Sequence, residues 1–258
     1  MRNKIKNVLK KTGLFPHAKA TRNKIKSFFP TQRAHQKKML SFYSEFIKPD
    51  DLVFDVGANI GNRTDIFLGL GARVVSIDPQ PSCIEQLNIK YRNNKKVNIV
   101  GMGLGAAPGV NKLNISNADT ISTMSEEWLN VVKQNNLFAG ATWDNFVEVP
   151  ITTLDILIES YGTPVFCKID VEGFELEVVK GLSSIIPVIS FEFLPEHKDA
   201  AIDVLNQLDK LGDFLCNVSL GESMKMHYGS WISLDDFMVD LASDEEFLDF
   251  GDIYIKYK

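Results

Sequence analysis

Four acidic residues follow or interrupt apolar runs of the sequence: Asp55, Asp78, Asp170 and Glu192. These runs predict buried parallel strands, and open α/β sheets bind ligands at the carboxyl ends of such strands. Asp170 and Glu192 belong to neighbouring predicted strands, so we expect them to converge as catalytic residues that accept a proton and orient a substrate. Glu192 stands in an otherwise apolar segment and needs a function or a partner, and an ion pair with Lys168 is the alternative.

Residues 52–61 predict a buried strand that turns sharply into a helix. Gly57 and Gly61 lie four residues apart, as in dinucleotide-binding turns. In those turns the middle position is also glycine, because the pyrophosphate must approach the backbone closely, but here it is Asn59. Helix N-terminal amides can hold a carboxylate and Asp55 an ammonium group, so the turn favours an amino-acid tail over NAD. A tight turn without any ligand is the alternative. The predicted cofactor-binding residues here are Asp55, Gly57, Ala58, Asn59, Gly61 and Asn62.

Two later segments complete the predicted cofactor site. Asp78 ends the second apolar run and precedes Pro79, and an acid in that position can accept both hydroxyls of a ribose. The glycine-rich stretch after the third run offers Met102, Gly103 and Leu104 as contacts for an adenine ring. A plain glycine loop is the other interpretation of that stretch.

Residues 55–61 (Asp-Val-Gly-Ala-Asn-Ile-Gly) and 77–79 (Ile-Asp-Pro) together resemble the S-adenosylmethionine site of Rossmann-like methyltransferases. Residues 168–175 (Lys-Ile-Asp-Val-Glu-Gly-Phe-Glu) and 190–193 (Ser-Phe-Glu-Phe) are similar to signature segments of the FkbM family. The resemblance covers roughly residues 40–195 and is most specific in Asp-Val-Glu-Gly.

The resemblance implies methyl transfer from S-adenosylmethionine, most often to a hydroxyl of a sugar, a polyketide or another small molecule. It also implies that the last strand, at 252–257, inserts antiparallel between the fifth and sixth. N-methylation is one competing function, although no Asn-Pro-Pro-Tyr or Asp-Pro-Pro-Tyr element is present. A binding module without catalysis is another, and the complete set of acids argues against it.

The expected fold is a Rossmann-like, mostly parallel sheet of seven strands with helices on both faces, preceded by a basic helical arm at 1–48. The domain at 49–258 carries an insertion at about 110–150. Trp128, Phe138 and Trp143 of the insertion either line a substrate pocket or simply pack. Predicted strands are 52–56, 72–77, 97–100, 165–169, 188–193, 214–218 and 252–257, with short ones at 113–115 and 146–149. Predicted helices are 31–48, 62–70, 82–91, 125–132, 152–160, 174–182, 199–211 and one opened by Ser233.

Charge is distributed unevenly along the chain. Residues 1–48 hold 13 Lys or Arg and one acid, a net charge of +12, whereas the remaining 15 bases and 32 acids give −17. An acidic catalytic body argues against a nucleic-acid substrate. Residues 1–30 alternate basic and apolar side chains, and we expect either peripheral contact with an anionic membrane or a solvated helix face.

Cysteine and histidine positions predict no metal site. Cys83, Cys167 and Cys216 are far apart, which favours a reduced compartment, and no apolar run is long enough to span a membrane, so the cytoplasm is expected. His197 remains a candidate base. Asp170 and Glu172 could face a magnesium ion, but Glu172 could equally cap the next helix, and no metal ligand is assigned. The sequence does not predict the oligomeric state.

Overall fold

The computed structural model describes residues 33–117, 122–132, 141–243 and 250–258. The chain divides into two compact units, one ending at Ser41 and the other formed by Phe42–Lys258. A helix runs through residues 33–43, inside the region where one was predicted. Residues 1–30, for which either peripheral membrane contact or a solvated helix face is expected, lie outside the described residues. All elements discussed below belong to the second unit.

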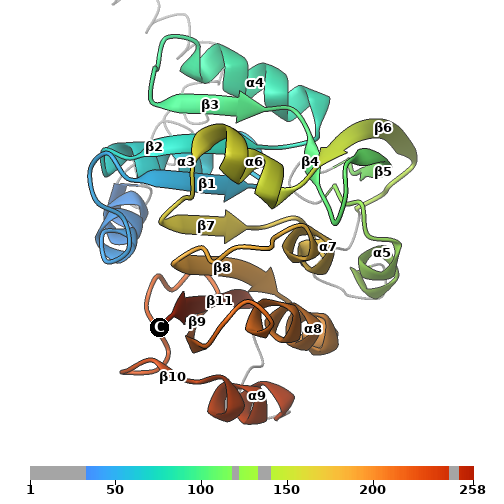
Figure 1. Cartoon of the computed structure of the whole chain (residues 1–258). Helices are drawn as coiled ribbons and strands as arrows, with labels where there is room; N and C mark the ends of the chain where they lie inside the picture. The colour runs from blue at the N-terminus through green and yellow to red at the C-terminus, as the bar shows by residue number, and fades with distance from the viewer. Residues whose placement is uncertain (1–32, 118–121, 133–140, 244–249) are drawn as a thin grey trace, which may run out of the picture. The chain divides into compact units, whose positions relative to one another are not determined.

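The central sheet has eight strands in the order β10-β9-β11-β8-β7-β1-β2-β3 (Figure 1). Five neighbours from β3 to β8 run parallel, whereas β11 is antiparallel to both β8 and β9, as the resemblance implied. The predicted count of seven is one short because the two-residue strand β10 pairs with β9 at the edge. The bounds are β1 (Leu52–Val56), β2 (Arg73–Ile77), β3 (Val97–Val100), β7 (Phe166–Ile169), β8 (Val188–Phe193), β9 (Phe214–Leu220), β10 (Ile232–Ser233) and β11 (Gly251–Tyr257).

Helices cover both faces of this sheet, as predicted. Side chains alternate along a strand, so Phe54 of β1 faces the main core with residues of α6, α7 and α8. On the opposite face, Phe67 of α3, Tyr43 and Phe166 of β7 contact one another edge to face. In Figure 1, α6 lies in front of the sheet and α3 behind it. The helices are α3 (Asn62–Gly69), α4 (Pro81–Tyr91), α5 (Glu126–Val132), α6 (Leu154–Tyr161), α7 (Glu175–Lys180), α8 (Lys198–Asp209), α9 (Leu234–Ala242) and the 3₁₀ helix η3 (Pro195–His197).

The start of α4 differs from the prediction. The helix predicted over 82–91 begins one residue earlier, at Pro81, with Gln80 as its N-cap. Proline suits the first helical position because the missing N–H has no partner there. The Ser82 hydroxyl instead accepts a hydrogen bond from Gln80 Nε2 at 2.9 Å.

The predicted insertion forms a second, three-stranded sheet in the order β4-β6-β5. Its strands are β4 (Gly103–Leu104), β5 (Gly109–Ile115) and β6 (Asn145–Thr152). β5 and β6 are longer than the segments expected at 113–115 and 146–149, and the two-residue β4, which precedes the insertion, was not predicted. The helix predicted from residue 152 begins at Leu154, because β6 continues through Thr152 and Thr153 caps α6. The hydroxyl of Ser125 accepts the Trp128 amide at 3.0 Å and so caps α5, which lies within the predicted helix 125–132. Trp128 and Trp143 pack edge to face, while Phe138 lies outside the described residues.

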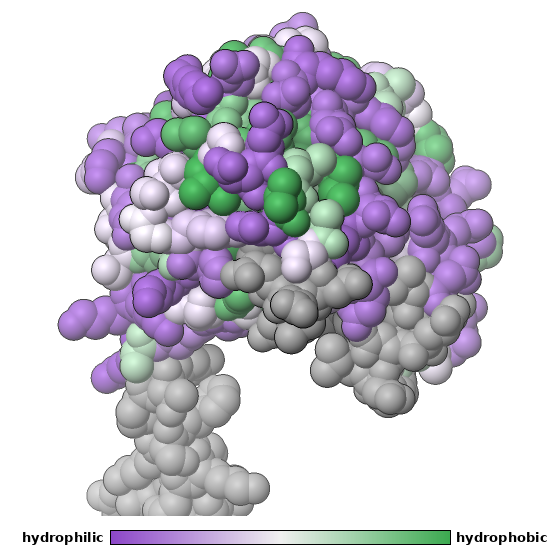
Figure 2. Space-filling model, turned by 90° about the horizontal axis from the view of Figure 1, so that it is seen from below, coloured by the Kyte–Doolittle hydropathy of each residue, from purple (hydrophilic) through white to green (hydrophobic). Residues whose placement is uncertain are grey.

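Figure 2 shows a mostly hydrophilic face of the molecule, with hydrophobic residues in a small group near its middle. Among the described helices, none combines the length and the hydrophobicity that crossing a bilayer requires.

Candidate active site

A cavity of about 320 Å³ opens where β1, β2, β7 and β8 reach their carboxyl ends. Gly61 is the one predicted site residue that does not line it. Gly61 caps α3 in the left-handed region, and a side chain there would collide with Tyr91. The predicted residues that do line the cavity are Asp55, Gly57, Ala58, Asn59, Asn62, Asp78, Pro79, Met102, Gly103, Leu104, Asp170 and Glu192.

The turn after β1 brings the first strand close to the end of β7. Gly57 has a φ of 78°, and a Cβ atom at this position would lie 1.7 Å from the backbone oxygen of Asp170. Only glycine permits that approach. Asn59 also has a positive φ, 49°, which asparagine tolerates better than most residues.

Asp78 is fixed by two backbone amides. Asn59 N donates to its Oδ2 and Gln80 N to its Oδ1, both at 2.8 Å, and the side chain is 6% exposed. Burial raises the pKa of Asp78 to about 6, although both amide hydrogen bonds oppose the shift. Each carboxylate oxygen keeps a lone pair, so the pair suits a vicinal diol such as ribose. Gln80, which also lines the cavity, was not among the predicted residues.

Asp55 lies deeper than the other predicted acids. Its Oδ2 accepts the hydroxyl of Thr64, which in turn lies 2.9 Å from the hydroxyl of Ser76. Burial raises the pKa of Asp55, and the Thr64 hydrogen bond opposes that shift. Asp55 therefore reaches the cavity with one oxygen engaged by α3.

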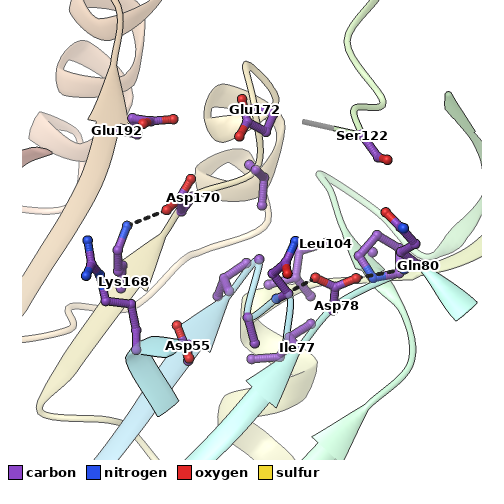
Figure 3. Close-up of a pocket in the computed structure, with 18 of the residues that line it drawn as sticks. Asp55, Ile77, Asp78, Gln80, Leu104, Ser122, Lys168, Asp170, Glu172 and Glu192 are labelled. Atoms are coloured by element: carbon purple, nitrogen blue, oxygen red, sulfur yellow. Dashed lines mark hydrogen bonds and ion pairs between the residues drawn. The ribbon is translucent and has the colours of Figure 1, made fainter. Parts of the chain in front are cut away.

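Asp170, Glu172 and Glu192 gather three carboxylates at the other end of the cavity. Their oxygens lie within 4.8 Å of one another, and Figure 3 shows Glu172 and Glu192 facing the space beside Asp170. Burial, then the charge of Asp170, raises the pKa values of Glu172 and Glu192 well above the usual range. Burial also disfavours ionised Asp170, but the charge and hydrogen bond of Lys168 outweigh it and lower the Asp170 pKa.

Lys168 does not pair with Glu192, the alternative partner considered from the sequence. Its Nζ lies 2.8 Å from Asp170 Oδ2 and 3.2 Å from Asp252 Oδ1. Asp252 belongs to β11, where it is the register partner of Glu192. Glu192 instead lies beside Asp170, with carboxylate oxygens of the two residues within 4.8 Å of each other.

Glu172 faces the cavity, and Glu175 supports the turn instead. Glu175 Oε1 accepts the amides of Val171 at 3.1 Å and Gly173 at 3.3 Å. Burial raises the pKa of Glu175 to about 7. Glu172 has a φ of 55°, and its carbonyl accepts the Thr123 hydroxyl at 2.6 Å, which links the turn to the insertion.

Several cavity residues were not predicted. Arg63 follows the glycine turn and binds Glu222 with two contacts of 2.9 and 3.0 Å; its position after Gly61 was a usable signal. Glu222 follows β9 at a great sequence distance, where no pattern indicated it. The other unpredicted lining residues include Leu113, Ser122, Met124 and Val171.

In the described part of the chain, the Asp170, Glu172 and Glu192 group is the one set of carboxylate, His or Cys side chains close enough to surround a metal ion. A carboxylate cluster alone does not specify a metal, and we assign none. His197 does not line this cavity; its Nε2 lies 3.5 Å from Glu127 Oε1.

The parallel sheet, the glycine turn and the Asp78 carboxylate define a Rossmann-like S-adenosylmethionine-dependent methyltransferase. The profile of the methyltransferase FkbM domain matches residues 55–217. The chain belongs to the FkbM methyltransferase family, and its cofactor is S-adenosylmethionine.

A curated relative is the hexuronic acid methyltransferase AglP of Haloferax volcanii, 24% identical over 177 residues. The match spans 63% of this chain and only 62% of that relative. A precorrin-6y C5,15-methyltransferase from Geobacter metallireducens aligns over 86% of each chain, with 10% identity and a TM-score of 0.45. A TehB-like methyltransferase from Corynebacterium glutamicum aligns over 90% of this chain and 97% of its own, with 8% identity and a TM-score of 0.45. Structural similarity at these scores carries no functional conclusion.

Proposed function

We propose that this methyltransferase transfers the methyl group to a hydroxyl oxygen of a sugar or another small molecule. The observation that carries the proposal is the meeting of Asp170 and Glu192 at the cavity end away from Asp78. A carboxylate there can accept the proton of a hydroxyl as its oxygen becomes nucleophilic. A sugar acceptor is also supported by the Haloferax volcanii relative, which is a hexuronic acid methyltransferase.

The cofactor is held by groups in a fixed order along the cavity. Asp78 accepts the ribose hydroxyls, Met102 and Leu104 contact the adenine, and the turn amides with Asp55 bind the amino-acid tail. These assignments place the reactive end of the cofactor toward Asp170, because the tail and the ribose occupy the β1 and β2 sides. When bound, S-adenosylmethionine supplies an electrophilic methyl group on a sulfonium that leaves as a neutral thioether.

Asp170 acts as the base and Glu192 positions the acceptor. The ionised Asp170 carboxylate takes the hydroxyl proton, while Glu192 orients the oxygen for in-line attack at roughly 3 to 3.5 Å. Alignment supplies most of the rate, and the base adds about 10² to 10⁴. Transfer to a hydroxyl is favoured over transfer to a carboxylate, because an acidic acceptor would meet the charge of Asp170.

N-methylation and cofactor binding without catalysis are the competing functions. The test incubates the protein with methyl-labelled S-adenosylmethionine and separate pools of neutral sugars, uronic acids and amino sugars. Labelled methyl ethers are stable to mild alkali, methyl esters are hydrolysed, and N-methyl products are identified by mass spectrometry. We expect alkali-stable label in the neutral pool; ester or N-methyl product alone would overturn the proposal.

The catalytic assignment is tested by single-turnover transfer with Asp170→Asn and Glu192→Gln, each first shown to bind the cofactor normally. We expect losses of about 10² to 10⁴ for Asp170→Asn and a smaller loss for Glu192→Gln. Exposed Asp213 and Glu159 offer the matched controls Asp213→Asn and Glu159→Gln. Wild-type rates in both site variants would show that neither carboxylate activates the acceptor.

A further inference from the structure

Lys168 is a buried cation without an assigned role in the proposed methyl transfer. It lies in the middle of β7, is 1% exposed, and contacts Asp170 and Asp252 through the same Nζ. A buried ammonium group is costly unless it is paired, and here two acids compensate it. Burial favours neutral lysine, but Asp170 and Asp252 outweigh it and hold the Lys168 pKa well above its usual range.

The two neighbouring glutamates lack such a cation. Within the described parts of the chain, neither Glu172 nor Glu192 forms an ion pair with a lysine or arginine, whereas Asp170 has Lys168 at 2.8 Å. Carboxylates this close cannot all ionise together. Two carboxylates with oxygens this close relieve their repulsion when one of them carries a proton, and only a protonated carboxyl can donate a hydrogen bond to the other.

We propose that Lys168, anchored by Asp252, is a positioning residue that keeps Asp170 ionised and leaves the shared proton on Glu192. This inference rests on the proposed function, because it decides which carboxylate of that site is the base. The titratable groups facing the pair are Lys168 from β7, Arg63 from α3, Glu172 from the following turn, Glu175 from α7, Asp55 from β1 and Asp252 from β11.

The arrangement balances charge before and after transfer. Lys168, Asp170 and Asp252 together carry one negative charge, which matches the single positive charge of a bound sulfonium. When Asp170 has accepted the hydroxyl proton, the three residues are neutral together, and so is the thioether product. A buried site avoids an uncompensated charge at either stage. Ion-paired Asp170 also has Oδ2 occupied by Lys168, which leaves Oδ1 for the acceptor.

The test uses carboxyl ¹³C NMR titration of the full chain labelled at Asp and Glu carboxyl carbons, with signals assigned by Asp170→Asn and Glu192→Gln. In the wild-type protein we expect Asp170 to be ionised and Glu192 protonated at neutral pH, with and without S-adenosylhomocysteine. This measurement needs no substitution of Lys168, so it stands even if that variant fails to fold. Protonated Asp170 beside ionised Glu192 would overturn the proposal.

Lys168→Met then removes the charge while keeping the length of the side chain. Because an opposite charge at this distance lowers an Asp pKa by about 1 to 3 units, the Asp170 titration should move up by that amount. Lys168→Arg should restore the wild-type titration of Asp170. Asp252→Asn should not raise the Asp170 pKa, because it removes a neighbouring negative charge. Unchanged Asp170 titration in folded Lys168→Met would reduce Lys168 to a packing role.

An identified acceptor adds a second readout. The acid limb of the pH–rate profile should shift upward in Lys168→Met and return in Lys168→Arg. Failure to methylate any hydroxyl would refute the proposed function but leave the NMR titration as it is. A product other than a methyl ether, found together with the expected Asp170 and Glu192 titrations, would therefore refute the proposed function and support the role of Lys168.

Discussion

At the scale of single residues, the proposed ribose contact is one carboxylate whose charge is costly. Asp78 is nearly buried, and only two backbone amides stabilise its ionised form. Binding a ribose diol requires that ionised form, because a protonated carboxyl loses acceptor capacity. Cofactor affinity should therefore be linked to the pKa of Asp78.

We predict that S-adenosylhomocysteine binds more weakly as the pH falls through about 6, the value to which burial raises the Asp78 pKa. Below that value the affinity should fall about tenfold per pH unit, since one proton competes with binding. Calorimetry across this range measures it. Asp78→Ala should bind at least about tenfold more weakly and lose this pH dependence. A flat wild-type profile would remove Asp78 from the ribose site.

A second residue-scale prediction concerns Gly57. Gly57→Ala places a methyl group against the Asp170 carbonyl and forces alanine to a φ of 78°, so the backbone strain alone should cost about 1 to 3 kcal/mol. Gly109→Ala is the matched control, because nothing lies within 4 Å of its Cβ position. Thermal unfolding and cofactor binding of both variants provide the comparison. Equal behaviour would show that the close approach of β1 and β7 is not required.

At the scale of elements, the turn between β7 and α7 places two of the three clustered carboxylates. Glu175 holds this turn through two backbone amides that share one of its oxygens. Its carboxylate is buried and acquires its charge only near neutral pH. The Glu175 side chain therefore affects both the geometry of the turn and the pH dependence of the protein's stability.

Glu175→Gln should keep both hydrogen bonds, because the amide oxygen can accept them, and it removes the buried charge. The folded-state pKa of about 7 lies above the usual value near 4.5, so the wild-type protein loses stability as pH rises between these values. We expect the variant to be more stable than wild type above pH 7, by about 1 to 3 kcal/mol. Denaturant unfolding at acidic and alkaline pH checks this. A difference that is the same at both pH values would contradict it.

At the scale of the whole molecule, charge is separated between a basic N-terminal region and an acidic body. The acidic body is consistent with a site that holds clustered carboxylates and a cationic cofactor. We propose that the basic residues 1–30 bring the enzyme to anionic membrane surfaces.

Binding to vesicles that contain anionic lipid should require residues 1–30 and should fall steeply with salt, because each base near such a surface contributes about 1 kcal/mol and is screened. Flotation of the full chain and of a chain lacking residues 1–30, with neutral vesicles as control, measures this. Equal flotation of both chains would mean that the basic residues only face water.

The sequence by itself determined the parallel strands, the cofactor turn and the acids at the strand ends. These features depend on neighbours in the chain: apolar runs favour strands, and Gly57 and Asn59 suit left-handed positions. Strand β8 was predicted with the observed bounds for this reason. The helix start predicted at Ser82 was wrong by one residue, because the adjacent Pro81 suits the first helical position.

Only the tertiary structure decided how the acids share charge. Asp252 reaches Lys168 because β11 inserts beside β8, and Glu222 reaches Arg63 across most of the chain. The ionisation of Asp170 depends on burial and on the distances to these groups, which act through space and leave no periodic pattern in the sequence. In the sequence, nothing distinguishes the ionisation of Asp170 from that of Glu172 and Glu192. In the folded protein their pKa values differ, because Asp170 lies against the buried Lys168.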